Sequence, residues 1–96
     1  MLARQLFNKA LYLLDRGAIE AAEQTLRAAL EQAALERDDY DEAEISRCLG
    51  ELLVERDRAA EARPYLETFV KSDLAHSMQK ERKAVEELLQ RINNAV

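Results

Sequence analysis

Two stretches of the chain, ALYLLDRGAIEAA over residues 10–22 and GELLVERDRAAEA over residues 50–62, align without a gap at an offset of 40 residues. Each begins with a small residue, continues through leucines to a polar turn, and then enters an alanine-rich segment. On both sides of the turn, apolar residues recur at spacings of three and four, which is the period of an α-helix. Each stretch therefore predicts a helix–turn–helix hairpin, and the chain is expected to contain two of them.

The helical spacing continues outward from these stretches over almost the whole chain. Five helices are expected: two in repeat one (about residues 3–36), two in repeat two (about 41–71) and a capping helix over about 73–94. The short connections force neighbouring helices to run antiparallel, and the abundance of Leu and Ala with few β-branched residues indicates no strands. We therefore predict an all-α fold, a single domain over residues 1–96 built from stacked antiparallel hairpins.

The two repeats match at the positions that set helix packing: Ala10/Gly50, Leu13/Leu53, Gly17/Asp57, Ala22/Ala62 and Leu26/Leu66. Small residues let two helices approach closely, and leucines fill the space beside them. This pattern resembles the tetratricopeptide repeat (TPR), a helix–turn–helix unit with a period of about 34 residues. The longer period of 40, with Pro64 two places after Ala62, is similar to the extended repeats of the kinesin light chain type. The resemblance covers residues 3–71 and implies a short right-handed solenoid, while Asp57 and Phe69 depart from the glycine and alanine that the family prefers.

In the repeats that the chain resembles, the first helix of each pair lines an inner groove that binds a partner. Carried across to this chain, the groove positions are Arg4, Phe7, Leu11 and Leu14 in repeat one and Glu44, Arg47, Glu51 and Val54 in repeat two. The family's clamp for carboxylates uses lysine and asparagine at groove positions, so that clamp is not expected here. The resemblance implies a protein–protein interaction module, an adaptor, scaffold or small chaperone, in which apolar residues anchor a peptide or helix and charged residues orient it.

The first helix also carries more apolar surface than one packing face requires. Phe7 and Leu11 form a second face, whereas a surface helix normally shows a single apolar stripe. The excess predicts a cover, which could be a bound helix or peptide, a second copy of the chain, or the last helix folding back. A structural homodimer that buries this face is therefore the alternative function.

The composition argues against several other classes of protein. The formal charge of −5 does not suit a nucleic-acid partner, because phosphate binding needs a basic surface. The longest apolar run, Leu11 to Leu14, is far shorter than the roughly 20 residues of a membrane span. With no visible signal peptide and a single cysteine, Cys48, a cytoplasmic location is expected.

The sequence predicts neither an enzyme nor a cofactor or metal site. The only histidine, His76, has no ligand constellation around it, and Cys48 has no neighbouring base. Two isolated glycines cannot form a phosphate loop. Paired carboxylates such as Glu20 and Glu23 are expected to be solvated helix surface.

Overall fold

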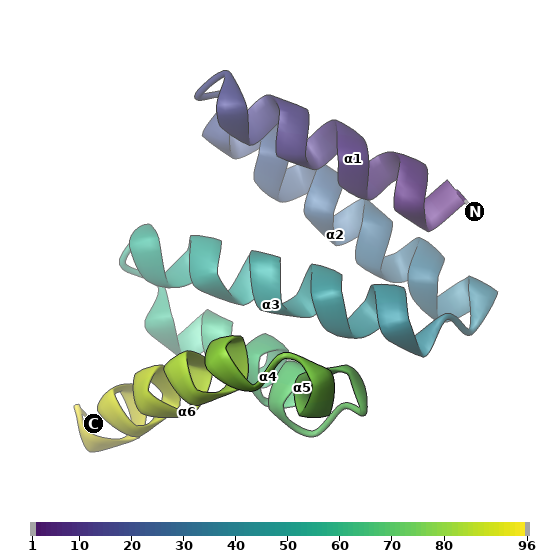
Figure 1. Cartoon of the computed structure of the whole chain (residues 1–96). Coiled ribbons are helices and arrows are strands. Elements are labelled where there is room, and N and C mark those ends of the chain that lie inside the picture. Colours follow the sequence, from purple (N-terminus) through teal and green to yellow (C-terminus); the bar gives the residue numbers. More distant parts are fainter. Residues whose placement is uncertain (1, 96) are drawn as a thin grey trace.

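The computed structural model of the chain describes residues 2–95, which form six α-helices and no strand. The helices are α1 (Leu2–Asp15), α2 (Ile19–Glu36), α3 (Asp39–Glu55), α4 (Ala59–Val70), α5 (Leu74–Ser77) and α6 (Gln79–Asn94). The predicted all-α class is confirmed. Figure 1 shows α1 and α2 lying antiparallel as a first hairpin, α3 and α4 as a second, and α6 packed against α4 at the end of the stack.

The two hairpins turn through the same backbone geometry. Gly17 and Asp57, which the sequence pairs at the turn, both adopt left-handed backbone, with φ of 76° and 62°. Glycine visits this region freely, and aspartate is one of the few other residues that tolerate it. In each turn the amide of this residue donates to a carbonyl three residues back, of Leu14 or Val54, at 3.0 Å. The following amide reaches the carbonyl five residues back, at 2.9 and 2.8 Å, so the match between the two turns extends to their hydrogen bonds.

Small residues bring the two helices of each hairpin together, as predicted. Ala10, Ala22 and Ala62 are completely buried. At Gly50, a Cβ atom would lie only 2.6 Å from Cδ2 of Leu66 on α4. Such a distance is well inside the usual carbon–carbon contact of about 3.5–4.0 Å, so any larger residue at position 50 would have to displace the Leu66 side chain.

The hairpins stack through α2 and α3 around one core. The longer repeat period is accommodated by long helices, of 18 residues in α2 and 17 in α3, against 12 in α4. Arg37 ends α2 in left-handed backbone, and Asp38 begins α3 by accepting a hydrogen bond from the Asp41 amide at 2.9 Å. A short acidic corner therefore turns the chain directly from the first hairpin into the second.

The expected single capping helix over residues 73–94 is wrong. The chain breaks at Met78, where φ is −120° and ψ is 58°, so α5 and α6 are separate helices. The Ser77 hydroxyl donates to the Leu74 carbonyl at 2.9 Å, a local bond that competes with helical continuation. The change of direction lets α5 bury Leu74 beside α3 and α4, while α6 buries Val85 along α4.

Candidate protein-binding face

The eight residues predicted to line a groove occupy corresponding places on α1 and α3. We call the surface that they mark the α1/α3 face: Arg4, Phe7, Leu11 and Leu14 on α1, with Glu44, Arg47, Glu51 and Val54 on α3. Their spacing of three and four residues puts each set along one side of its helix. In Figure 1, α1 and α3 run in the same direction in front of α2 and α4, so both helices begin on one side of the molecule and end on the other.

Arg4 joins α1 to α3 at the first end of this face. Its guanidinium hydrogen-bonds the carboxylate of Asp41 and lies 2.8 Å from Oε1 of Glu44. The same group lies 5.2 Å from the centre of the Phe7 ring, within the range of a cation–π contact. Arg4 is therefore committed to contacts within the chain and is not a free cation for a ligand carboxylate.

Phe7 is not part of an exposed apolar face, and that expectation is wrong. Its side chain is only 5% exposed and belongs to the hydrophobic core. The guanidinium of Arg4 lies over its ring, and α3 packs beside α1 at this end. The last helix does not fold back over α1 either, because within residues 2–95 α6 packs against α4 and α5.

Arg47 takes the place in repeat two that Phe7 takes in repeat one. Its guanidinium pairs with Glu51 at 3.1 Å and lies 5.6 Å from the centre of the Phe69 ring on α4. In repeat one the residue that corresponds to Phe69 is Ala29. The bulky aromatic ring thus lies on the first helix in repeat one and on the second helix in repeat two.

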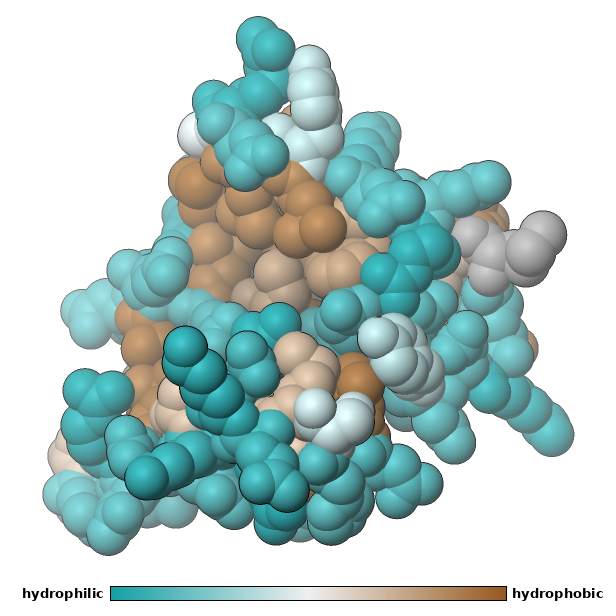
Figure 2. Space-filling view, viewed as in Figure 1, coloured by the Kyte–Doolittle hydropathy of each residue, from teal (hydrophilic) through white to brown (hydrophobic). Residues whose placement is uncertain are grey.

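The other end of the face is apolar and partly exposed. Leu11 is 40% exposed, and Leu14 and Val54, which correspond between the repeats, are half-buried against the core. Figure 2 shows this side of the molecule, with hydrophobic residues gathered over α1 and toward α3 and hydrophilic residues along α6 in front. The α1/α3 face therefore divides into a charged end, where Arg4 and Arg47 are paired, and an apolar end.

Cys48 of α3 lies among several carboxylates of the same helix. Burial raises the pKa of the Cys48 thiol to about 11, against a smaller opposite effect of Arg47, and the charges of Glu51, Glu44 and Glu55 add to the rise. The negative charges of all three glutamates therefore disfavour the thiolate form of Cys48. The thiol is protonated at neutral pH, which does not suit a nucleophile.

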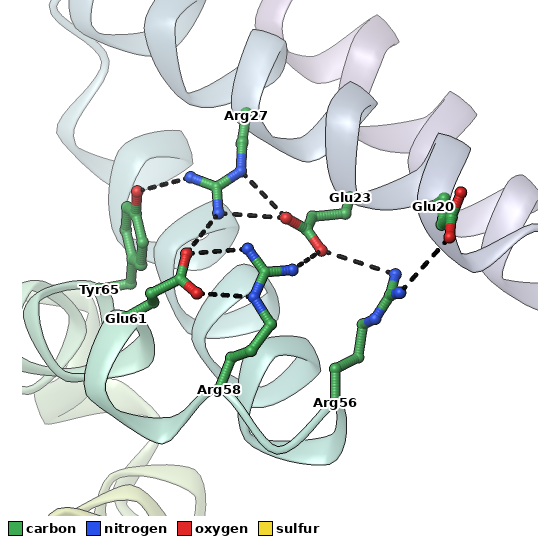
Figure 3. Close-up of polar contacts among 7 residues, drawn as sticks. All are labelled: Glu20, Glu23, Arg27, Arg56, Arg58, Glu61 and Tyr65. Atoms are coloured by element: carbon green, nitrogen blue, oxygen red, sulfur yellow. Dashed lines mark hydrogen bonds and ion pairs between the residues drawn. The ribbon is translucent and has the colours of Figure 1, made fainter.

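A polar network joins the two hairpins on another side, and sequence reasoning missed it (Figure 3). Glu23 of α2, expected to be solvated, is only 8% exposed. Its carboxylate accepts hydrogen bonds from Arg27 at 3.1 Å and from Arg58 at 2.7 Å, and Arg58 also pairs with Glu61. Arg27 extends the network to the hydroxyl of Tyr65 at 3.0 Å. The network fastens α2 to the beginning of α4.

Glu23 is ionised in this setting. Burial alone would raise the pKa of Glu23, but hydrogen bonds from Arg58 and Arg27 outweigh burial and hold the pKa below its ordinary value. Arg56 adds a third cation, 3.6 Å from Glu23 and 3.8 Å from the exposed Glu20. The cluster is fully paired, so we assign it to the stability of the stack and not to ligand binding.

Two further features concern metal ions and membranes. Within residues 2–95, no three His, Cys, Asp or Glu side chains are grouped as a metal ion would need. His76 is exposed, with its ring 3.4 Å from Arg82. Across the same residues, none of the helices combines the length and apolar character that crossing a membrane requires.

Two hollows of the surface lie away from the α1/α3 face. One, of about 530 Å³, lies against the outer side of α2 and is lined by Leu6, Ala28 and Leu35 among others. Another, of about 470 Å³, lies between the start of α3 and the end of α4 and is lined by Tyr40 and Lys71 among others. Neither contains any of the eight predicted residues, so a partner on the α1/α3 face would lie along a surface.

The fold and this face define an all-α protein of two stacked, internally similar hairpins with a closing helix. The chain matches no protein-family model, no curated protein and no solved structure.

Proposed function

We propose that the chain is a protein–protein interaction module of the TPR type, an adaptor or scaffold that binds a peptide or helix along its α1/α3 face. One observation carries this proposal: at the apolar end of the face, Leu11 is 40% exposed, and Leu14 and Val54 are only half-buried. A contiguous exposed apolar patch is characteristic of an interaction surface.

Kinship with extended TPR repeats is supported by the internal symmetry of the chain. The turns at Gly17 and Asp57 share their backbone angles and hydrogen bonds. The crossing at Gly50 and Leu66 is as close as the small-residue position of the repeat requires. These features go beyond the general abundance of Ala and Leu in helical proteins.

The anchoring residues in this proposal are Leu11, Leu14 and Val54, without Phe7. A leucine that goes from exposed to buried contributes roughly 1.5–3 kcal/mol, so two or three such contacts can hold a partner helix. Arg4 and Arg47 are already paired with carboxylates, and they contribute to orientation through the field of the face and not by clamping a carboxylate.

The experiment is a selection of peptides from a random library on the immobilised wild-type chain, followed by calorimetry on variants. We expect Leu11→Gln to weaken a selected peptide by about tenfold or more, since one apolar anchor is lost. The matched control is Leu35→Gln on α2, where the leucine is 77% exposed and lies off the face. Backbone amide shifts should change along α1 and α3 when the peptide binds.

Two results would count against the proposal. Selected peptides that bind Leu11→Gln as tightly as the wild type would show that the apolar end is not the anchor. Peptides that lose affinity with Leu35→Gln and keep it with Leu11→Gln would move binding to the hollow on α2.

A further inference from the structure

The apolar end of the α1/α3 face is bordered by negative charge at the last residues of two helices. Asp15 is the final residue of α1, Glu55 is the final residue of α3, and both are exposed. They correspond at the offset of 40, directly after Leu14 and Val54. Within residues 2–95, neither carboxylate makes an ion pair.

These positions are unfavourable for the helices themselves. The last carbonyls of an α-helix carry the equivalent of about half a negative charge, so a cation is the stabilising residue there. Neither α1 nor α3 has a basic residue in its last turn. Two helix ends and two carboxylates therefore place four sources of negative potential beside the apolar patch.

The nearest arginines do not neutralise this charge. Arg16, which follows α1, donates a hydrogen bond to the Tyr12 hydroxyl at 3.1 Å and stacks over that ring. Arg56, which follows α3, turns toward Glu23 and Glu20. Their guanidinium groups are directed to other partners at both helix ends.

The remaining charge of the face is negative as well. Arg4 is matched by two carboxylates, Asp41 and Glu44, and Arg47 is matched by Glu51. Once these pairs are formed, the unmatched charges on the face are carboxylates. We refer to the two unpaired carboxylates that border the apolar end, Asp15 and Glu55, as the acidic rim.

From this arrangement we infer that the partner is a basic amphipathic segment, with aliphatic side chains that cover Leu11, Leu14 and Val54 and with Lys or Arg that meet the acidic rim. The inference rests on the proposed function and adds the chemistry of the partner. Interfaces are arranged so that potentials of opposite sign meet, and a helix that lies in an apolar groove presents its anchors at spacings of three and four.

The same charges disfavour a second copy of the chain as the occupant. A twofold contact places the same patch of both copies opposite itself. One interface would then contain two acidic rims, between chains whose formal net charge is −5 each. Opposed like charges weaken such a contact, so the homodimer is the less favoured occupant of this face.

The test compares two synthetic helical peptides of equal length and leucine pattern, one with lysine and one with glutamate at its polar positions. We expect the Leu/Lys peptide to bind the wild-type chain, with an affinity that falls as salt rises. We expect no measurable binding of the Leu/Glu peptide. Leu11→Gln should weaken the Leu/Lys peptide by about tenfold, as in the test of the proposed function.

A pair of double variants separates the acidic rim from the overall charge. Asp15→Asn/Glu55→Gln should weaken the Leu/Lys peptide by about three- to tenfold and flatten its salt dependence. The control, Glu31→Gln/Glu87→Gln on the exposed sides of α2 and α6, removes the same charge and should leave the affinity within about twofold.

Each contrary outcome has a separate meaning. Equal weakening by the two double variants would overturn the inference, because attraction would then come from the net charge of the chain. A Leu/Glu peptide that binds along α1 and α3 and is sensitive to Leu11→Gln would overturn the basic partner and leave the proposed function standing. A dimer in light scattering that Leu11→Gln dissociates would assign the face to a second copy and overturn the inference.

Discussion

Gly50→Ala sets two effects of known size against each other at the crossing of α3 and α4. Alanine in a helix interior is about 1 kcal/mol more favourable than glycine, so on propensity alone the variant gains stability. The new Cβ would lie 2.6 Å from Cδ2 and 2.8 Å from Cγ of Leu66, whose side chain is fully buried. Since both atoms must move by about 1 Å in a packed core, overpacking should cost about 2–3 kcal/mol. We expect a net loss of about 1–2 kcal/mol, and a fall in Tm of roughly 4–15 °C.

The assay is urea unfolding followed by circular dichroism, carried out as a double-mutant cycle with Leu66→Ala. Leu66→Ala alone should cost about 2–5 kcal/mol because it leaves a cavity. In that background the clash is gone, so Gly50→Ala should stabilise by about 1 kcal/mol. A reversal of sign between the two backgrounds is the expected signature of direct contact.

A neutral or stabilising Gly50→Ala in the wild-type background would refute the reasoning, because the helices would then be farther apart than described. Gly17→Ala is the control. No atom lies within 4 Å of its future Cβ, but its φ of 76° is strained for alanine. It should cost about 1 kcal/mol in both backgrounds, and a dependence on Leu66 there would invalidate the cycle.

Three further outcomes follow from the described contacts. Asp38→Ala removes the cap on the Asp41 amide and should lower the free energy of unfolding by about 0.5–2 kcal/mol in urea; no change would show that the cap contributes nothing. Glu23→Gln should lower it by about 1–3 kcal/mol at neutral pH. Because the folded pKa of Glu23 lies below its ordinary value of 4.5, the wild type holds this stability above that pH and loses it as the pH falls through the lowered pKa. The gap to the variant should therefore close in acid, and a constant gap would contradict the ionised carboxylate. Cys48, with its pKa raised from 9.0 to about 11, should react with a disulfide reagent at mildly alkaline pH roughly 100-fold more slowly than in the unfolded chain, and equal rates would contradict its burial.

The hairpins could be predicted because their determinants repeat within the sequence itself. The small residue at Ala10 and Gly50 and the turn residue at Gly17 and Asp57 recur at one offset, and the structure uses each pair in the same way. The break at Met78 could not be predicted, because the apolar spacing continues through it without a proline or glycine. The hydrogen bond that marks the break is made by a single serine hydroxyl, which no periodic pattern reveals.

The sequence predicted which side of α1 the candidate residues occupy, but not which of their side chains are buried. Helical spacing assigns Arg4, Phe7 and Leu11 to one side of α1, but it does not show which of them a neighbouring helix covers. Phe7 is buried because α3 approaches α1 at that end and Arg4 crosses to Asp41. Glu23 is a similar case, because its buried carboxylate is paired with Arg58, which is 35 residues away in the sequence. Contacts between repeats decide burial, and they lie outside the reach of a local pattern.

Comparison of the two repeats shows which positions of the α1/α3 face are determined by packing in the core and which are not. At Phe7 and Arg47 the repeats differ, and they differ again at Ala29 and Phe69 on the second helices, where the Phe69 ring lies against Arg47. Such paired change is expected where packing fixes the total volume. These positions therefore serve the fold, and they are poor candidates for recognition.

The repeats agree instead at the end of the face, where an apolar residue is followed by a carboxylate, as Leu14–Asp15 and Val54–Glu55. Packing does not require the carboxylates, which are exposed, and helix electrostatics disfavours them at a carboxyl-terminal end. Both repeats hold this feature at a cost of about 0.3–1 kcal/mol each, and within residues 2–95 neither carboxylate has an ion-pair partner that offsets it. The basic amphipathic partner inferred above would offset this cost, and Asp15 and Glu55, rather than the paired Arg4, would then set its orientation on the α1/α3 face.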